Sequence, residues 1–314
     1  MNVRHVYING LFVPETKAAL SIHDTAVATG EVVAEVDRTF NQRLFRLDDH
    51  LKRLKLGLQE LEIDLPMKLG TLEALTLQTL NLNLPTESAE VDWQTVHYVS
   101  RGLVKAFGLF DDSELKPSIA IACFPLTRRL AKLSPQYQKG VDLIVVPQRQ
   151  IPASILSPQI KSRGRLDYLI ARAQAQKLMP GSTGVLLSPD GYIRECTGAS
   201  LFMVMRDGTL VTAPTETILD GVTRSVVLEC TESLGIPVVE RNLTVSEALD
   251  ACEMFVSSTV ICLLHARSFN NQLLGDGTVG PITNKIRQAF IQTVGLDYIK
   301  QANDYQQLIG ADQP

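Results

Sequence analysis

The chain has 314 residues, 20% of them charged, and a formal net charge of -4 at pH 7. No run of Lys and Arg occurs, so we expect neither nucleic acid nor an anionic membrane as a partner. The longest apolar stretches, such as "SIAIACF" and "VDLIVV", are far too short to span a bilayer, and the first residues lack the apolar core of a signal peptide.

Two hairpins are predicted near the start of the chain. Residues 5–14 alternate between apolar and polar around Asn9-Gly10, and residues 31–47 alternate around Asn41-Gln42. Asn-Gly is a strong turn signal because both residues tolerate a left-handed backbone. We therefore expect two pairs of antiparallel strands.

Helical spacing follows these hairpins. Leucines recur every three or four residues between positions 47 and 63, and Asp48 is the expected N-cap of this helix. A second helix is predicted over residues 69–82. Two further strands are predicted in "TVHYVSRGLV" and "PSIAIACFPL". The first part of the chain thus indicates a sheet that carries helices.

The stretch "LTRRLAKLSPQYQKG" is polar, basic and irregular, and we interpret it as a linker. This interpretation gives an N-terminal domain at residues 1–126, a linker at 127–139 and a C-terminal domain at 140–314. Two domains are also what a chain of this length favours.

The C-terminal domain is predicted to be rich in strands. "GVDLIVVP" indicates a buried strand, and hairpin turns are expected at Asp190-Gly191 and Asp207-Gly208. A helix is predicted from Val222 to Leu234, ended by Gly235. "EMFVSSTVICLL" is interpreted as one strand with a polar break, and "GPITNKIRQAFIQTVG" as the terminal helix. The whole chain therefore predicts a mixed α/β fold in two unequal domains.

The five cysteines are scattered and never form a C-x-x-C pair. This usage is typical of reduced thiols in a protein core, so we expect a cytoplasmic protein. The five histidines have no metal-ligand spacing. We therefore predict no metal site.

Four features of the second half follow one another in an order that suggests chemistry. Lys161 lies where an extended segment turns into a helix, and Glu195 lies on the second arm of a hairpin. Val222 and Thr223 begin a helix, and "VSSTV" places small hydroxyl residues within a strand. Taken singly, these features are most simply a surface cation, a solvated anion, a helix cap and a β-bulge.

As a set, the same features match what pyridoxal 5'-phosphate requires. A lysine amine forms a Schiff base with the aldehyde of this cofactor. A carboxylate that faces the pyridine nitrogen keeps it protonated, so the ring accepts electrons. Backbone N–H groups at a helix N-terminus, hydroxyl groups and an arginine bind the phosphate.

The ordered set resembles the class IV aminotransferases, also called fold-type IV pyridoxal phosphate enzymes. This group includes branched-chain aminotransferases, D-amino acid aminotransferases and aminodeoxychorismate lyases. The resemblance extends from "YINGLFVP" through "FRLDDHLKRL", "IKSRGRL", "GYIRECTGASLF" and "ILDGVTRSVV" to "LGDGTVGPIT". It implies a smaller N-terminal sheet-and-helix domain and a larger C-terminal β-rich pseudo-barrel domain with helices. It also implies a cofactor between the two domains and a homodimer.

The resemblance assigns roles to individual residues. Lys161 takes the role of the Schiff-base lysine and of the group that moves the substrate proton. Arg53, in the block "HLKRL", is expected at the phosphate, and Glu195 at the pyridine nitrogen. The remaining cofactor residues that it implies are Val222, Thr223, Ser258 and Thr259.

Substrate recognition departs from the family patterns. D-amino acid aminotransferases carry an aromatic residue before the glutamate of the first-domain strand, where this chain has Ala34. Their Arg-x-His motif for the substrate carboxylate is missing from "RGLVKAFGLF", where Lys105 is the only cation after Arg101. "KSRGRL" is nearer to the aminodeoxychorismate lyases, and Tyr168 is displaced from the tyrosine of the branched-chain enzymes. The candidate substrate residues are Ala34, Arg101, Lys105, Arg163, Arg165 and Val260.

The resemblance implies a transaminase that moves an amino group from an amino acid, branched-chain-like or other, to a 2-oxo acid with ping-pong kinetics. Two alternatives stay open. The first is a pyridoxal-phosphate lyase of the aminodeoxychorismate lyase type, which eliminates a group instead of exchanging an amine. The second is a homologue that kept the fold and binds a ligand without turnover.

Overall fold

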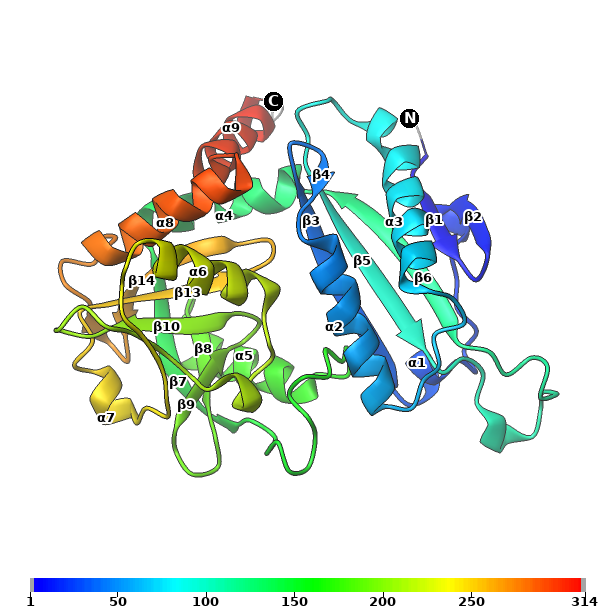
Figure 1. The fold of residues 1–314 in the computed structure, drawn as a ribbon, viewed down its shortest axis with the longest axis horizontal. Coiled ribbons are helices and arrows are strands. Elements are labelled where there is room, and N and C mark those ends of the chain that lie inside the picture. The colour runs from blue at the N-terminus through cyan, green and yellow to red at the C-terminus, as the bar shows by residue number, and fades with distance from the viewer. Residues whose placement is uncertain (1–2, 312–314) are drawn as a thin grey trace. The chain divides into compact units, whose positions relative to one another are not determined.

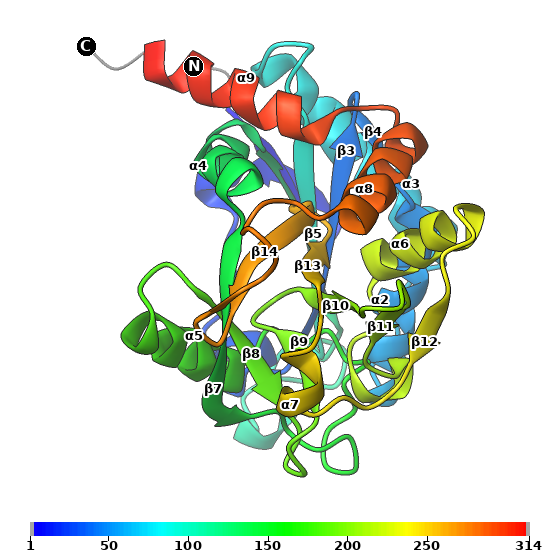
Figure 2. The ribbon, with the colours of Figure 1, turned by 90° about the vertical axis from the view of Figure 1, so that its left-hand side faces the viewer.

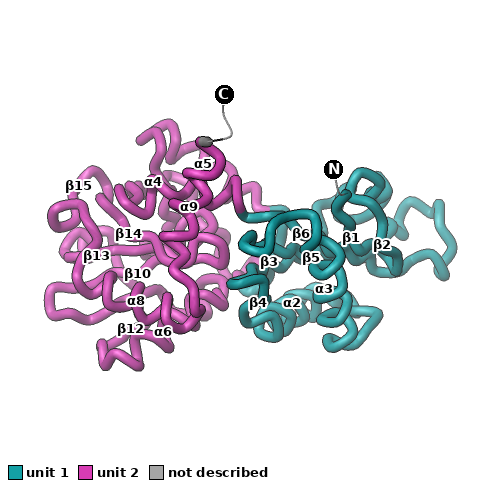
Figure 3. The backbone as a smooth tube through the Cα atoms, turned by 90° about the horizontal axis from the view of Figure 1, so that it is seen from above, with its two compact units in different colours: residues 1–126, 159–164 teal, residues 127–158, 165–314 magenta. Residues whose placement is uncertain are grey.

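The computed structural model describes residues 3–311, and the chain divides into two compact units (Figure 3). Unit 1 consists of Met1–Leu126 and Gln159–Gly164, and unit 2 consists of Thr127–Pro158 and Arg165–Pro314. Gln159–Gly164 therefore belongs to the first unit, whereas the sequence placed it in the second domain. The physical reason is that this segment pairs with a strand of unit 1.

Unit 1 contains a six-stranded sheet in the order β2-β1-β6-β5-β3-β4, with antiparallel neighbours throughout. The strands are β1 (His5–Ile8), β2 (Leu11–Pro14), β3 (Val32–Phe40), β4 (Arg43–Leu44), β5 (Trp93–Ser100) and β6 (Ser118–Pro125). Both predicted hairpins are confirmed. Their turns have positive φ angles, for example 52° at Asn41 and 60° at Gln42, as two-residue hairpin turns require.

Two long helices of unit 1, α2 (Leu47–Glu60) and α3 (Leu69–Asn83), pack beside β3, β5 and β6 (Figure 1). The shorter helical segments are α1 (Thr25–Ala28) and the 3-10 turns Glu15–Lys17, Leu84–Thr86 and Lys105–Phe107. Leu51, Leu54 and Leu58 of α2 are 1–2% exposed and form the core with strand residues. The prediction that Asp48 caps α2 is wrong. Arg46 is the N-cap, in a left-handed conformation, and Asp48 lies in the first turn, 3.0 Å from Lys52 Nζ.

Unit 2 contains a nine-stranded sheet in the order β12-β11-β10-β13-β14-β7-β8-β9, with β15 paired to β14. The strands are β7 (Val141–Arg149), β8 (Thr183–Leu187), β9 (Ile193–Cys196), β10 (Ser200–Val204), β11 (Leu210–Thr212), β12 (Val238–Glu240), β13 (Glu253–Ser258), β14 (Cys262–Phe269) and β15 (Gln272–Leu273). The predicted single strand "EMFVSSTVICLL" is in fact β13 and β14. The polar break is the turn that reverses the chain between them.

The helices of unit 2 are α4 (Thr127–Lys139), α5 (Leu166–Leu178), α6 (Val222–Ser233), α7 (Val245–Ala248), α8 (Pro281–Val294) and α9 (Tyr298–Ala311), with a 3-10 turn at Thr215–Thr217. The interpretation of residues 127–139 as an irregular linker is wrong, because they form α4. This helix packs beside α9 (Figure 2). The Ser134 hydroxyl lies 2.6 Å from Asn303 Oδ1 and 2.7 Å from Gln306 Oε1. The predicted terminal helix, α8, is followed by α9, which the sequence analysis did not predict.

No helix in the described part of the chain combines the length and the apolar character needed to cross a bilayer.

Candidate functional site

Lys161 is held by strand pairing along the edge of β3. Its carbonyl oxygen accepts a hydrogen bond from the Ala34 N–H at 2.9 Å, and the Arg163 N–H donates to the Val32 carbonyl at 3.1 Å. Ser162 forms the antiparallel bridge with Val33 between them. The predicted position of Lys161 just before a helix is confirmed, since α5 begins at Leu166. The backbone under Lys161 is therefore fixed by the sheet.

Helix α2 crosses directly over this segment. A Cβ built on Gly57 would lie 3.1 Å from Val33 Cγ1 and 3.7 Å from the Ile160 backbone. Ile160 itself is 7% exposed and belongs to the core cluster of unit 1. A glycine at position 57 thus permits the close approach that clamps the residue before Lys161.

Arg163 and Ala34 lie on the face of β3 opposite the helices. The Arg163 guanidinium carbon is 5.3 Å from the centre of the Tyr98 ring, and Tyr98 is the cross-strand partner of Ala34. Side chains alternate along an extended segment, so Lys161 belongs to the same face as Arg163. Ala34 is 1% exposed. This face beside the Lys161 segment therefore carries one cation, one aromatic ring and one small apolar side chain.

Arg53 makes a bidentate ion pair with Glu35 of β3. Its Nη2 lies 2.6 Å from Glu35 Oε1, and its Nε lies 2.9 Å from Glu35 Oε2. Burial would raise the pKa of Glu35, but Arg53 and His50 outweigh this effect and hold that pKa well below its usual value. Glu35 is thus an ionised partner of Arg53, which the sequence analysis did not identify. A carboxylate within the apolar first half of the strand, "VVAEV", was its only signal.

Glu195 lies on β9 and is 4% exposed. The Tyr168 hydroxyl of α5 donates a short hydrogen bond to Glu195 Oε1. Burial, and then the Glu195 charge, raise the pKa of Tyr168 well above its usual value, so the hydroxyl keeps its proton. Tyr168, which the family pattern placed out of register, therefore orients the carboxylate predicted to face the cofactor.

The first turn of α6 presents backbone N–H groups without a cap. Gly221 occupies the N-cap position and has no side chain to accept hydrogen bonds from Val222, Thr223 or the residue after them. The first N–H groups of a helix lack intrahelical partners, and the dipole of the helix makes this end attractive to anions. The N-terminus of this 12-residue helix can therefore bind a phosphate.

Hydroxyl groups of β10 and β13 lie beside this helix end. A Cβ on Gly221 would lie 3.2 Å from Ser200 Oγ, and Ser200 is the cross-strand partner of Ser257. Ser257 is 2% exposed, and its Oγ has no hydrogen-bond partner among residues 3–311. A buried hydroxyl without a partner is costly unless a ligand or water completes it. Ser257 was not predicted as a site residue, because the family resemblance assigned the hydroxyl groups that follow it in the sequence to the cofactor.

The predicted residues next to Ser257 lie at the end of β13 and in the following turn. Ser258 is the last residue of β13 and pairs with Cys262 across the turn. Thr259 and Val260 form the turn itself, and Val260 is 2% exposed. Helix α6 contacts β13. The strand that ends at Ser258 therefore packs beside α6.

Two of the cations proposed for substrate recognition, Arg101 and Lys105, pair with acidic side chains. Arg101 pairs with Glu31 at 2.7 Å and donates to the carbonyls of Leu61 and Glu62. Lys105 is 77% exposed and lies 3.0 Å from Asp112. The Arg165 guanidinium carbon lies 4.7 Å from the centre of the Tyr168 ring. Arg165 is thus the one of these cations that lies next to a residue in contact with Glu195.

The predicted residues fall into two groups, each organised within its own unit. Unit 1 contains Ala34, Arg53, Arg101, Lys105, Lys161 and Arg163, and unit 2 contains Arg165, Glu195, Val222, Thr223, Ser258, Thr259 and Val260.

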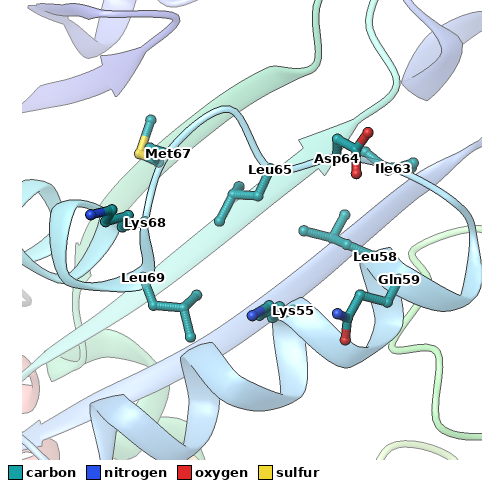
Figure 4. A pocket seen from close by; sticks show the side chains of 9 residues that line it. All are labelled: Lys55, Leu58, Gln59, Ile63, Asp64, Leu65, Met67, Lys68 and Leu69. Carbon is teal, nitrogen blue, oxygen red and sulfur yellow. The ribbon is translucent and has the colours of Figure 1, made fainter.

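Two pockets lie away from these residues. A pocket of about 460 Å³ between α2 and α3 is lined by Leu58, Leu65 and Leu69 with Lys55 and Lys68 at its rim (Figure 4). Another, of about 490 Å³, lies beside the first residues of α8 in unit 2. Neither contains a predicted site residue. Within residues 3–311 no cluster of three or more His, Cys, Asp or Glu side chains could hold a metal ion.

Comparisons with a family model, with known sequences and with solved structures all match aminotransferases. The family model described as amino-transferase class IV matches residues 32–269. A protein of Methanocaldococcus jannaschii assigned as a branched-chain-amino-acid aminotransferase is 30% identical over 91% of this chain and 94% of its own length. The D-alanine aminotransferase of Bacillus licheniformis is 28% identical over 92% of this chain and 96% of its own. The structure of the branched-chain amino acid aminotransferase of Escherichia coli matches with a TM-score of 0.82 and 25% identity, over 92% of this chain and 94% of that one.

Proposed function

The chain belongs to the class IV aminotransferases, and on this premise we propose that it transfers the amino group of a branched-chain-like amino acid to a 2-oxo acid, with pyridoxal 5'-phosphate bound through Lys161. The relatives named above are aminotransferases, so neither elimination nor a loss of turnover is favoured. Ping-pong kinetics follow from this chemistry, because one substrate leaves before the other binds.

The observation that carries the cofactor assignment is the uncapped N-terminus of α6 beside Ser257. This helix end offers the N–H groups of Val222 and Thr223, and the buried Ser257 hydroxyl has no partner among residues 3–311. A phosphate would satisfy both, since it accepts several hydrogen bonds and carries negative charge. Ser258 and Thr259 stand at the end of the same strand. The residues present therefore fit the phosphate of the cofactor.

Each remaining residue has a distinct task in this proposal. The bound cofactor supplies an electron sink that stabilises negative charge on the substrate carbon. The Lys161 amine attaches the cofactor and then moves the proton at the substrate α-carbon, from a backbone fixed to β3. Glu195, oriented by Tyr168, binds the pyridine N–H. Arg53, whose guanidinium Glu35 holds through two hydrogen bonds, would contact the phosphate.

We infer the substrate class from the face of β3 that lies beside the Lys161 segment. Val32 and Ala34 are 8% and 1% exposed, and they present small apolar side chains where a bulky aliphatic substrate needs room. Arg101 and Lys105, the candidate substrate cations of the loop that lacks the Arg-x-His motif, are paired with Glu31 and Asp112. We therefore favour branched-chain amino acids over D-alanine, which the D-alanine aminotransferase relatives make the second candidate.

The cofactor assignment is tested by covalent labelling of the lysine that binds the cofactor. Purified protein is incubated with pyridoxal 5'-phosphate, reduced with borohydride and digested, and the modified peptide is located by mass spectrometry. We expect modification at Lys161 and none there in Lys161→Ala, which keeps the circular dichroism spectrum of the wild type. Modification at another lysine with Lys161 untouched would refute the assignment. Leucine, isoleucine, valine and D-alanine are then compared as amino donors with 2-oxoglutarate.

We also propose a homodimer. The α5 residues Leu166, Leu169 and Ile170 are 70%, 56% and 49% exposed and recur at helical spacing. Apolar side chains gathered on one helix face are typical of surfaces that a partner covers, and most soluble oligomers are symmetric homo-oligomers. Sedimentation equilibrium should give twice the chain mass. Leu169→Asp should lower that mass toward the monomer, whereas Lys177→Asp, on the same helix, should not.

We infer a cytoplasmic location from the cysteines. Cys123, Cys196, Cys230 and Cys262 are buried free thiols, and Cys252 is exposed. Burial raises the pKa of the Cys230 thiol, which keeps it protonated and unreactive. Such thiols suit a reducing compartment. Fractionation of cells that express the full chain, with the enzyme assayed in each fraction, tests this inference.

A further inference from the structure

A buried ionic cluster lies in unit 1, between the sheet and helices α2 and α3. Glu35 and Asp37 occupy alternate positions of β3 and face the same side, and both are 0% exposed. His97 of β5 and His50 of α2 are 0% and 2% exposed. Two buried carboxylates are costly unless they are paired. Their partners therefore indicate what the cluster does.

The contacts form a chain that starts on α3. The Thr76 hydroxyl lies 2.8 Å from His97 Nε2, and His97 Nδ1 lies 3.3 Å from Asp37 Oδ2. The Thr95 hydroxyl donates to the same Asp37 oxygen at 3.1 Å. Asp37 Oδ1 then lies 3.5 Å from His50 Nδ1.

The same chain ends on Arg53. His50 Nδ1 lies 3.0 Å from Glu35 Oε1, and Glu35 holds Arg53 through both carboxylate oxygens. Since a carboxylate only accepts hydrogen bonds, the Nδ1 atom of His50 carries a proton. Arg53 is 9% exposed, more than Glu35, Asp37, His50 or His97 behind it. The chain of contacts thus runs from the core outward to a single guanidinium.

Stability alone does not explain Asp37. Glu35 already pairs with Arg53, so Asp37 adds a second buried carboxyl group. Its Oδ1 atom and His97 Nδ1 form no well-directed hydrogen bond within residues 3–311. Apolar residues at such positions are often neutral or stabilising. What the cluster does fix is geometry, because a bidentate pair sets the plane of the guanidinium.

We propose that Asp37 and His97 are positioning residues for Arg53: Asp37, 3.5 Å from His50 Nδ1 and backed by His97, keeps this edge of the imidazole turned toward Glu35, so that the Arg53 guanidinium is preset for the phosphate of the cofactor. This inference rests on the proposed function, in which Arg53 contacts that phosphate. Asp37 and His97 touch neither cofactor nor substrate in this scheme. Their effect reaches the phosphate through the orientation of one side chain.

The test separates the phosphate from the rest of the cofactor. Dissociation constants are measured by fluorescence titration for pyridoxal 5'-phosphate and for pyridoxal, which lacks the phosphate. The ratio of the second constant to the first reports what the phosphate contributes to binding. We expect this ratio to fall about tenfold or more in Arg53→Gln and about three- to tenfold in Asp37→Asn, since charge-assisted hydrogen bonds are lost or misaligned.

Asp92→Asn is the matched control. Asp92 is a buried aspartate of the same unit, and it accepts hydrogen bonds from Thr39 and Gln42. We expect it to lower the melting temperature without changing the ratio. Thr95→Val removes only the hydroxyl that holds Asp37, so it tests the chain of contacts should Asp37→Asn fail to fold. Like Asp37→Asn, Thr95→Val should lower the ratio.

The outcomes distinguish the two proposals. A ratio that falls in Arg53→Gln but stays at the wild-type value in Asp37→Asn and Thr95→Val overturns the positioning role and leaves the phosphate contact intact. A ratio that does not change in Arg53→Gln removes the phosphate contact and, with it, the present inference. An equal fall in Asp92→Asn would also overturn the inference, because any damage to the core would then suffice.

Discussion

The Tyr168 hydroxyl donates a hydrogen bond to the Glu195 carboxylate, which joins α5 to β9 within unit 2. Both groups are largely withdrawn from water, so the bond is charge-assisted and poorly screened. It fixes the position of one of the two oxygens of Glu195, so the positions of α5 and β9 determine the direction in which the carboxylate points. Tyr168, in the first turn of α5, thus orients the carboxylate that is proposed to face the pyridine nitrogen.

Tyr168→Phe should therefore destabilise unit 2 and loosen the cofactor. Removing a hydrogen bond to a buried charged group costs about 1.5–3 kcal/mol. We expect a loss of this size in urea unfolding, together with weaker binding of pyridoxal 5'-phosphate. Tyr192→Phe is the control, because no hydrogen bond of the Tyr192 hydroxyl occurs among the described residues. Equal stability of the two variants would contradict the role given to Tyr168.

The Glu35–Arg53 pair predicts an acid transition in unit 1. The folded pKa of Glu35 lies well below its usual value of 4.5. Its stabilising effect is therefore fully present above pH 4.5 and is lost as the pH falls through the folded pKa. Glu35→Gln should cost about 3–5 kcal/mol at neutral pH, because Arg53 is left without its partner.

The pH dependence itself separates this effect from general acid unfolding. Stability measured by urea unfolding at a series of pH values below 4.5 should fall less steeply in Glu35→Gln than in the wild type. Glu73→Gln, at an exposed position of α3, should follow the wild-type slope. Parallel slopes for wild type and Glu35→Gln would show that Glu35 does not contribute.

Two glycines of the loop between β5 and β6 should respond differently to alanine. Gly102 has a φ of 92°, and a Cβ there would lie 1.9 Å from the Lys116 carbonyl oxygen. Gly108 has a φ of 61° with open space around it. Gly108→Ala should cost about 1 kcal/mol for the left-handed backbone alone. Gly102→Ala should cost about 2–5 kcal/mol, because the carbonyl has to move as well. The free energies of unfolding of the two variants are compared. An equal loss in both, or a larger loss in Gly108→Ala, would contradict the prediction.

Periodicity predicted those elements whose buried faces are apolar. Hairpins with Asn or Asp at their turns and the leucine-rich α2 belong to this group, and the structure confirms them. Helix α4 was missed because its buried stripe contains Ser134 and its interior contains Pro135. Helix α9 was missed for a similar reason: most of its length is polar, and its buried face depends on contact with α4. Such helices are defined by their tertiary partners.

The candidate site shows the same division. Short motifs located Lys161, Glu195 and the start of α6, because each needs a local conformation that the sequence encodes. The Glu35–Arg53 pair could not be predicted in this way, since it joins a strand and a helix 18 positions apart. The same is true of Tyr168 with Glu195, which lie 27 positions apart. Side-chain pairing depends on packing, which a local pattern does not report.

Ser257 gives the sharpest prediction for the cofactor site. Its buried hydroxyl has no partner among residues 3–311, so Ser257→Ala should leave the stability of the cofactor-free protein unchanged or raise it slightly. If a phosphate binds beside it at the start of α6, the same variant should weaken pyridoxal 5'-phosphate and inorganic phosphate while leaving pyridoxal unaffected.

Ser134→Ala provides the contrast. Ser134 is also fully buried in unit 2, but its hydroxyl is hydrogen-bonded to Asn303 and Gln306. This variant should lose about 0.5–1.5 kcal/mol of stability and keep wild-type phosphate affinity. Thermal melts of both variants with and without inorganic phosphate measure the two effects together. If Ser257→Ala lost stability as Ser134→Ala does and kept its protection by phosphate, the hydroxyl would belong to the core, and the phosphate site would have to be sought elsewhere.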